Sequence, residues 1–100
     1  MHDYIFYNTD KELAKKRIED MLNESEIPKI VNIEWKDDDL SITITKAGQS
    51  KVILALNENE NDIIITERER EVAWLHKSFI SMVETIIEQK ILQVGAFKRN

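Results

Sequence analysis

Cysteine is absent from this chain of 100 residues, and proline and glycine are scarce, with one and two copies respectively. The absence of cysteine excludes a disulfide framework, a thiolate metal site and a cysteine nucleophile. With so little glycine and proline, no linker or low-complexity segment divides the chain. We therefore expect a fold without covalent cross-links, which can form equally well in a reducing compartment.

Long apolar runs are missing too. The longest unbroken run, Val52 to Leu56, has five residues, whereas a membrane-spanning helix needs about 20. The N-terminal residues, Met1 to Tyr4, show no basic stretch followed by an apolar one, so no secretory signal is predicted. These absences predict a cytoplasmic protein that does not bind a membrane.

Positive charge is in deficit. The chain has 14 Lys and Arg residues against 19 Asp and Glu residues, which gives a formal net charge of −5. Because phosphate backbones are bound by clustered Lys and Arg, we do not expect direct nucleic-acid binding. Hydrophobic residues make up 42% of the chain and charged residues 33%, a balance typical of an ordered globule. One core can form at this length, so residues 1–100 are predicted to make a single domain.

The hydrophobic pattern predicts an α+β fold with two helices. The sequence from Thr9 to Glu12 fits a capping box, with Thr9 as the N-cap of an amphipathic helix over residues 10–24. A long helix is predicted over residues 67–94, with glutamates near its start where the helix dipole favours negative charge.

Between the two helices the apolar residues alternate or form short runs, as they do in strands. Four strands are predicted, over residues 31–36, 40–45, 51–56 and 63–66. Their connections are short enough to join only antiparallel neighbours, so the strands should form a meander. Residues 4–7 indicate an additional N-terminal strand, and both helices are expected to pack on one face of the sheet.

Acidic residues are concentrated in two of the predicted turns. In a meander, alternate turns lie at the same end of the sheet, and with strands about 4.8 Å apart these turns should be roughly 10 Å from each other. The acidic rim predicted at this end consists of Asp37, Asp38, Asp39, Glu58, Glu60 and Asp62. Such a rim can meet a basic surface on a partner or imitate nucleic-acid phosphates. Alternatively, Asp and Asn stand there because they suit turn backbones.

The acidic region that begins at Asn57 was also compared with the ligand pattern of a calcium-binding loop. Asn57, Asn59 and Asn61 occupy the first, third and fifth positions of such a loop. An EF-hand needs Asp first, Gly sixth and Glu twelfth, but this chain has Asn57, Asp62 and Arg68 there. We predict no metal site and no cofactor, with a weak surface cation site as the remaining alternative.

Catalytic motifs are also missing. His76 falls on the apolar side of the predicted last helix, with no nucleophile or phosphate-binding loop beside it. We interpret His76 as a buried histidine with a hydrogen-bond partner, and Lys90 as a side chain that reaches past the core to water. The sequence therefore does not predict an enzyme.

Apolar residues at exposed positions predict contact surfaces. Trp74 and Leu92 fall on the polar side of the last predicted helix, where Trp suits an anchor for another protein unless the chain itself covers it. Ile53 and Ile64 project from the strands away from the helices. They would leave an apolar patch for a second copy to cover in a homodimer, unless residues 4–7 cover it or pair with a sheet edge.

These observations favour a non-enzymatic protein-binding module. One version is a small acidic inhibitor or adaptor, for example phage-encoded, that docks on a macromolecular partner through the acidic rim. The alternative is a carrier of a small molecule or lipid, with the ligand between the sheet and the last helix in a cavity lined by Trp35, Phe79 and Met82.

Overall fold

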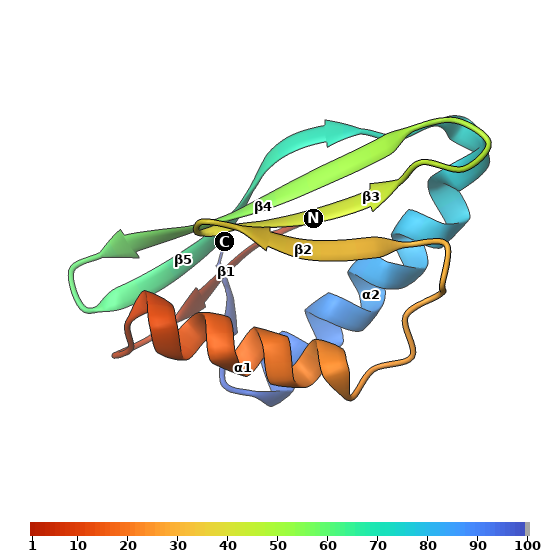
Figure 1. The fold of residues 1–100 in the computed structure, drawn as a ribbon. Coiled ribbons are helices and arrows are strands. Elements are labelled where there is room, and N and C mark those ends of the chain that lie inside the picture. The colour runs from red at the N-terminus through yellow and green to blue at the C-terminus, as the bar shows by residue number, and fades with distance from the viewer. Residues whose placement is uncertain (100) are drawn as a thin grey trace.

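The computed structural model describes residues 1–99 and shows one antiparallel sheet of six strands with two α-helices (Figure 1). The helices are α1 (Lys11–Asn23) and α2 (Lys77–Gln93), the second preceded by a short 3₁₀ helix, η1 (Trp74–His76). The strands are β1 (Asp3–Phe6), β2 (Asn32–Lys36), β3 (Asp39–Ile44), β4 (Ser50–Asn59), β5 (Asp62–Glu71) and β6 (Phe97–Arg99). The predicted α+β class is confirmed.

The strands are ordered β2-β3-β4-β5-β1-β6 across the sheet. The predicted meander is confirmed for β2 to β5, because each of these strands pairs antiparallel with the next. The predicted N-terminal strand is also present, and it pairs with β5, with Tyr4 opposite Ile65. Beyond it lies β6, which pairs with β1 and was not predicted. The edges of the sheet are therefore β2 and β6.

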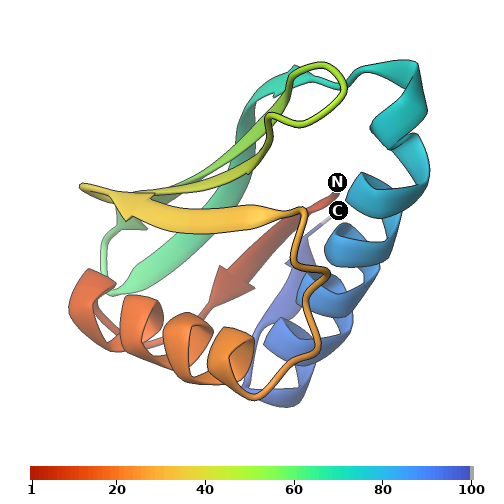
Figure 2. The same ribbon diagram turned by 45° about the vertical axis from the view of Figure 1, so that its right-hand side comes forward.

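Both helices lie on one side of the sheet (Figures 1 and 2). The core forms where their apolar stripes meet the inward side chains of the strands. In α2 the buried stripe follows helical spacing, with Ile80, Val83, Ile87 and Ile91 almost wholly inaccessible to solvent. Neither helix of the described residues combines the length and apolarity needed to cross a bilayer.

The last helix begins later than predicted, at Lys77 rather than at residue 67. The intervening residues extend β5 to Glu71, opposite the first half of β4, where Lys51 pairs with Glu71 across the strands and its Nζ lies 3.6 Å from Glu69. Glu and Arg favour helices as isolated residues, but pairing with β4 outweighs that preference here. The acids near residue 67 therefore do not lie at a helix N-terminus.

Two other local predictions need correction. The N-cap of α1 is Asp10, whose carboxylate accepts the N–H of Leu13 at 2.9 Å, while the N–H of Thr9 is donated to the carbonyl of Asn61. The connection predicted over residues 57–62 is shorter, because β4 and β5 continue up to a tight turn. Thr9 is thus tied to that turn rather than to the helix.

The outer face of the sheet carries no helix, yet its central apolar residues are buried. Ile53 is 5% exposed and Ile64 is 8% exposed, so the prediction that they leave an open apolar patch is wrong. Ile64 stands opposite Ile5 of β1, so the alternative that residues 4–7 pair with the edge of the meander is confirmed. An ion pair between Arg68 of β5 and Asp39 of β3, 2.7 Å apart, spans the intervening strand β4.

Candidate protein-binding surface

The largest exposed apolar side chains beside one another in sequence lie on η1. Trp74 is 77% exposed and Leu75 is 54% exposed. Both residues precede α2, which begins at Lys77. We call Trp74 and Leu75 the η1 surface. The alternative that the chain itself covers Trp74 is wrong.

A buried hydrogen-bond network holds η1 in place. The hydroxyl of Ser50, at the start of β4, accepts the N–H of Ala73 at 2.9 Å and lies 2.7 Å from Nδ1 of His76. The Nε2 of His76 is 2.9 Å from the carbonyl of Lys46, which can only accept, so this nitrogen carries the proton. The Ser50 hydroxyl then donates to Nδ1. The interpretation of His76 as a buried, hydrogen-bonded residue is confirmed, with two partners instead of one.

The β3–β4 loop also packs closely against η1. Gly48 adopts a φ of +115°, and a side chain there would lie 3.7 Å from both the Cβ of Ala73 and the Cε1 of His76. Ser50 and His76 resemble a nucleophile and its base, but they are only 3% and 2% exposed. A substrate would not reach them, so their contact supports the turn that presents Trp74.

Leu92 does not belong to the η1 surface. It is 45% exposed and lies in the last turn of α2, whereas Trp74 precedes the helix altogether. Trp74 belongs to a 3₁₀ helix, so it does not lie on one continuous α-helix with Leu92 as predicted. The two residues were not expected to touch each other, and they lie in different elements.

The two acidic turns lie at the same end of the sheet. The N–H of Leu56, near the end of β4, is donated to the carbonyl of Asp38 in the β2–β3 turn at 3.1 Å. From there the β4–β5 hairpin continues outward, and it forms the projecting tip in Figure 1. The β2–β3 and β4–β5 turns therefore lie at the same end of the sheet, but the β4–β5 turn extends further from it.

Cations from the chain itself neutralise the nearer part of the acidic rim. The carboxylate of Asp38 lies 2.9 Å from Nζ of Lys11 and 3.8 Å from Nζ of Lys15, and the hydrogen bond from Lys11 lowers the pKa of Asp38. Asp39 is paired with Arg68, as described above. A partner would have to displace these cations to use both carboxylates.

The remaining rim residues differ from one another. Asp62 accepts the N–H of Asn8 at 2.8 Å, and the carbonyl of Asp37 accepts from Lys15 at 2.6 Å. Glu58 and Glu60 are exposed and make no ion pair with any of the described residues. The exposed carboxylates of Asp37, Glu58 and Glu60 therefore make no ion pair with a described residue, although Glu58 lies close enough to Lys11 to raise the pKa of that lysine.

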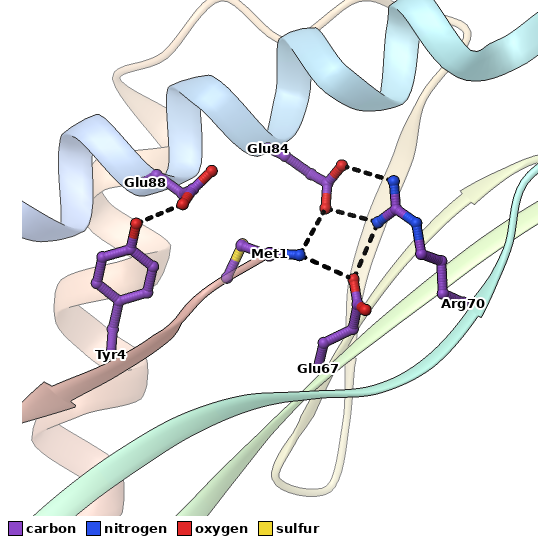
Figure 3. A network of polar contacts seen from close by, with 6 residues as sticks. All are labelled: Met1, Tyr4, Glu67, Arg70, Glu84 and Glu88. Carbon is purple, nitrogen blue, oxygen red and sulfur yellow. Dashed lines mark hydrogen bonds and ion pairs between the residues drawn. The ribbon is translucent and has the colours of Figure 1, made fainter. Parts of the chain in front are cut away.

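A second polar cluster joins β5, α2 and the N-terminus (Figure 3). Arg70 donates to both carboxylate oxygens of Glu84, at 2.8 and 3.1 Å, and to Glu67 at 2.9 Å. The amino group of Met1 lies 3.4 Å from Glu67 and 3.9 Å from Glu84. The hydrogen bonds that Arg70 donates to Glu84 raise the pKa of Arg70 above its usual value. The sequence pattern missed this cluster, because it assigned Glu67 and Arg70 to a helix.

Tyr4 extends the cluster towards the other end of α2, where its hydroxyl donates to Glu88. Burial, with a further contribution from Glu88, raises the pKa of Tyr4 well above its ordinary value. Within residues 1–99, no three His, Asp or Glu side chains are grouped so as to hold a metal ion. We interpret the cluster as an electrostatic clamp between the sheet and α2.

Trp35 does not lie in a cavity with the residues predicted to share it. It lines an open groove of about 280 Å³ beside α1, and neither Phe79 nor Met82 contributes to that groove. The Nζ of Lys15 stands 5.0 Å from the centre of the Trp35 ring, a cation–π contact. Comparisons with family models, with curated proteins and with solved structures find no match.

Proposed function

We propose that this chain is a non-enzymatic protein-binding module that contacts its partner through the η1 surface. The observation that carries the proposal is the 77% exposure of Trp74 on a turn fixed by hydrogen bonds to Ser50 and His76. Trp is one of the residues enriched among the hot spots of protein interfaces. A rigid support lowers the entropic cost of binding, because the surface is already ordered before the partner arrives.

The version in which the acidic rim docks on a basic groove has weaker support. Asp38 and Asp39 already have cationic partners, which leaves mainly Asp37, Glu58 and Glu60 for an outside surface. The two versions respond differently to salt. A complex made by the η1 surface should persist in high salt, whereas a complex made by the rim should weaken steeply as the Debye length shrinks.

Leu75→Ala and Leu92→Ala form a matched pair for testing the proposal. Both remove the same side chain, which is 54% exposed in one case and 45% in the other. In affinity capture from lysate of the source cell, we expect Trp74→Ala and Leu75→Ala each to reduce the main retained protein about tenfold, as hot-spot truncation does. Leu92→Ala should retain it at the wild-type level.

The capture is repeated at low and high salt, with circular dichroism to show that each variant is folded. If both leucine variants lose the same amount of retained protein, the retention reflects non-specific hydrophobic binding. Retention that survives Trp74→Ala but disappears in high salt would favour the acidic rim instead. Either outcome contradicts the η1 surface as the contact.

A further inference from the structure

The hydrogen-bond network that holds η1 includes a titratable side chain, His76. Its ring is 2% exposed, and both of its nitrogens are bound within the chain. Nε2 donates to the carbonyl of Lys46, and Nδ1 accepts from the hydroxyl of Ser50. This arrangement fits the neutral ring only, because Nδ1 must carry no proton if it is to accept a hydrogen bond.

A second proton on the ring would disrupt the contact with Ser50. Both nitrogens of an imidazolium are donors, so Nδ1 would direct its proton at the Ser50 oxygen. That oxygen already accepts the N–H of Ala73 at 2.9 Å, and the hydrogen of the Ser50 hydroxyl would have to turn away. Because Ser50 is only 3% exposed, the displaced hydrogen would point away from bulk water, which costs free energy.

The charged groups around His76 do not compensate for a positive ring. On the neighbouring elements they are Lys46 of the β3–β4 loop, Lys51 of β4, Glu69 and Glu71 of β5, and Lys77 of α2. Among the described residues none forms an ion pair with His76, and Lys51 lies 3.6 Å from Glu69 and opposite Glu71. Three cations accompany two acids, so a buried imidazolium would lack a counter-charge.

Little apolar burial keeps η1 in place once this network is broken. Trp74 and Leu75 expose 77% and 54% of their surface, so neither contributes much to the core. Segments with few buried apolar contacts open at a lower free energy than the core strands do. The state of the His76 ring therefore controls a segment that can detach while the sheet stays folded.

We propose that His76 is a pH switch for η1, and that uptake of a proton by its ring releases Trp74 and Leu75 from their fixed position. This inference rests on the proposed function, because it concerns how the η1 surface is presented. An unconstrained histidine takes up a proton near pH 6.5, whereas the intact network holds the neutral ring. The network is therefore complete above about pH 6.5 and is lost as the pH falls below that value.

The test is amide hydrogen exchange of the isotope-labelled chain, measured by NMR at pH 7 and pH 5 and corrected for the intrinsic exchange rate at each pH. The reporter is the N–H of Ala73, which the Ser50 oxygen binds. If only the released state takes up the proton, its population rises about 20-fold over this range, and the protection of this amide should fall by the same factor. The amides of residues 52–56, in the centre of the sheet, should keep their protection.

His76→Gln and His2→Gln form a matched pair. Glutamine takes up no proton in this range, so the protection of Ala73 should become independent of pH in His76→Gln. His2 is the other histidine and is exposed, so its replacement should leave the fall in protection unchanged. The experiment uses the chain without a partner, so its outcome does not depend on whether the η1 surface retains a protein in the capture.

Three results would overturn the proposal. Unchanged protection of Ala73 at pH 5 would show that the ring does not control the network. An equal loss of protection at Ala73 and in residues 52–56 would show that acid unfolds the whole chain instead of releasing η1. A fall that persists in His76→Gln would assign the effect to another group. The first two results need only the wild type, so they decide the matter even if the glutamine variant does not fold.

Discussion

Ser50 shows how a single buried hydroxyl can determine the position of an exposed side chain. Its oxygen accepts the N–H of Ala73 and donates to His76, so two groups from the segment around Trp74 depend on it. The sequence gives little indication of this role, because an isolated Ser before a strand is usually a turn residue. The signal was the buried position of His76, which implied a partner without identifying it.

Ser50→Ala should therefore lower the free energy of unfolding by about 1–3 kcal/mol, because it leaves the Ala73 N–H and the His76 ring nitrogen buried without partners. Urea denaturation followed by circular dichroism measures the change. Ser78→Ala, at an exposed position of α2, is the control and should change stability by less than about 0.5 kcal/mol. Equal effects of the two substitutions would show that the network does not support η1.

Glu60 is held in a backbone conformation that glycine adopts more easily. Its φ is +57°, in the left-handed region, at the turn between β4 and β5. Glu60→Gly should raise the free energy of unfolding by about 1 kcal/mol, because it relieves the clash of a side chain at positive φ. Glu58→Gly, two residues earlier in β4, should lower it, since glycine weakens a strand. Thermal denaturation of both variants checks the opposite signs.

At the scale of elements, the contact between β1 and α2 should make stability depend on alkaline pH. The pKa of Tyr4 is raised in the folded chain by burial and by Glu88, while in the unfolded chain it is about 10. Below pH 10 the phenol is neutral in both states and this contact contributes fully. As the pH rises above 10, only the unfolded state loses the proton, so stability falls.

The measurement is urea denaturation between pH 8 and 11 for the wild type and for Tyr4→Phe. The wild type should lose stability above about pH 10, and Tyr4→Phe should lose less over the same range. Tyr7→Phe, at an exposed tyrosine, is the control and should keep the wild-type profile. A profile for Tyr4→Phe that parallels the wild type would contradict the clamp between β1 and α2.

Elements with a regular apolar pattern were predictable from the sequence, and those that depend on distant partners were not. The alternation of Ile33 and Trp35 and the helical spacing of Ile80, Val83 and Ile87 lead directly to β2 and α2. β6 has three residues and exists because β1 lies beside it. The second half of β5 carries charged residues on both faces. Neither the two-residue period of a strand nor the 3.6-residue period of a helix can therefore be recognised in its hydrophobic pattern.

The candidate contact surface was predicted only in part. Trp74 was expected to be exposed or covered by the chain itself, and the structure leaves it exposed. Its neighbour Leu75 is exposed as well, and the 3₁₀ turn that carries both residues was not predicted from the sequence. The cations beside Asp38 and Asp39 come from α1 and β5, so nothing local to the turn indicates the neutralisation.

On the scale of the whole molecule, the exposed apolar residues and the open groove lie on different parts of the fold. The η1 surface is carried by the turn before α2 and presents Trp74 and Leu75. The groove lies beside α1 and is lined by Trp35 among others. The salt series described above tests the η1 surface separately from the acidic rim.

The place of β1 between β5 and β6 also affects how the chain must assemble. Tyr4 pairs with Ile65 on one side and with Lys98 on the other, so both neighbours of β1 come from far along the chain. During synthesis the first strand therefore waits with both edges open while the hairpins from β2 to β5 already have local partners. The sheet is therefore completed from its β2 edge towards its β6 edge, and β1 is among the last strands to be enclosed.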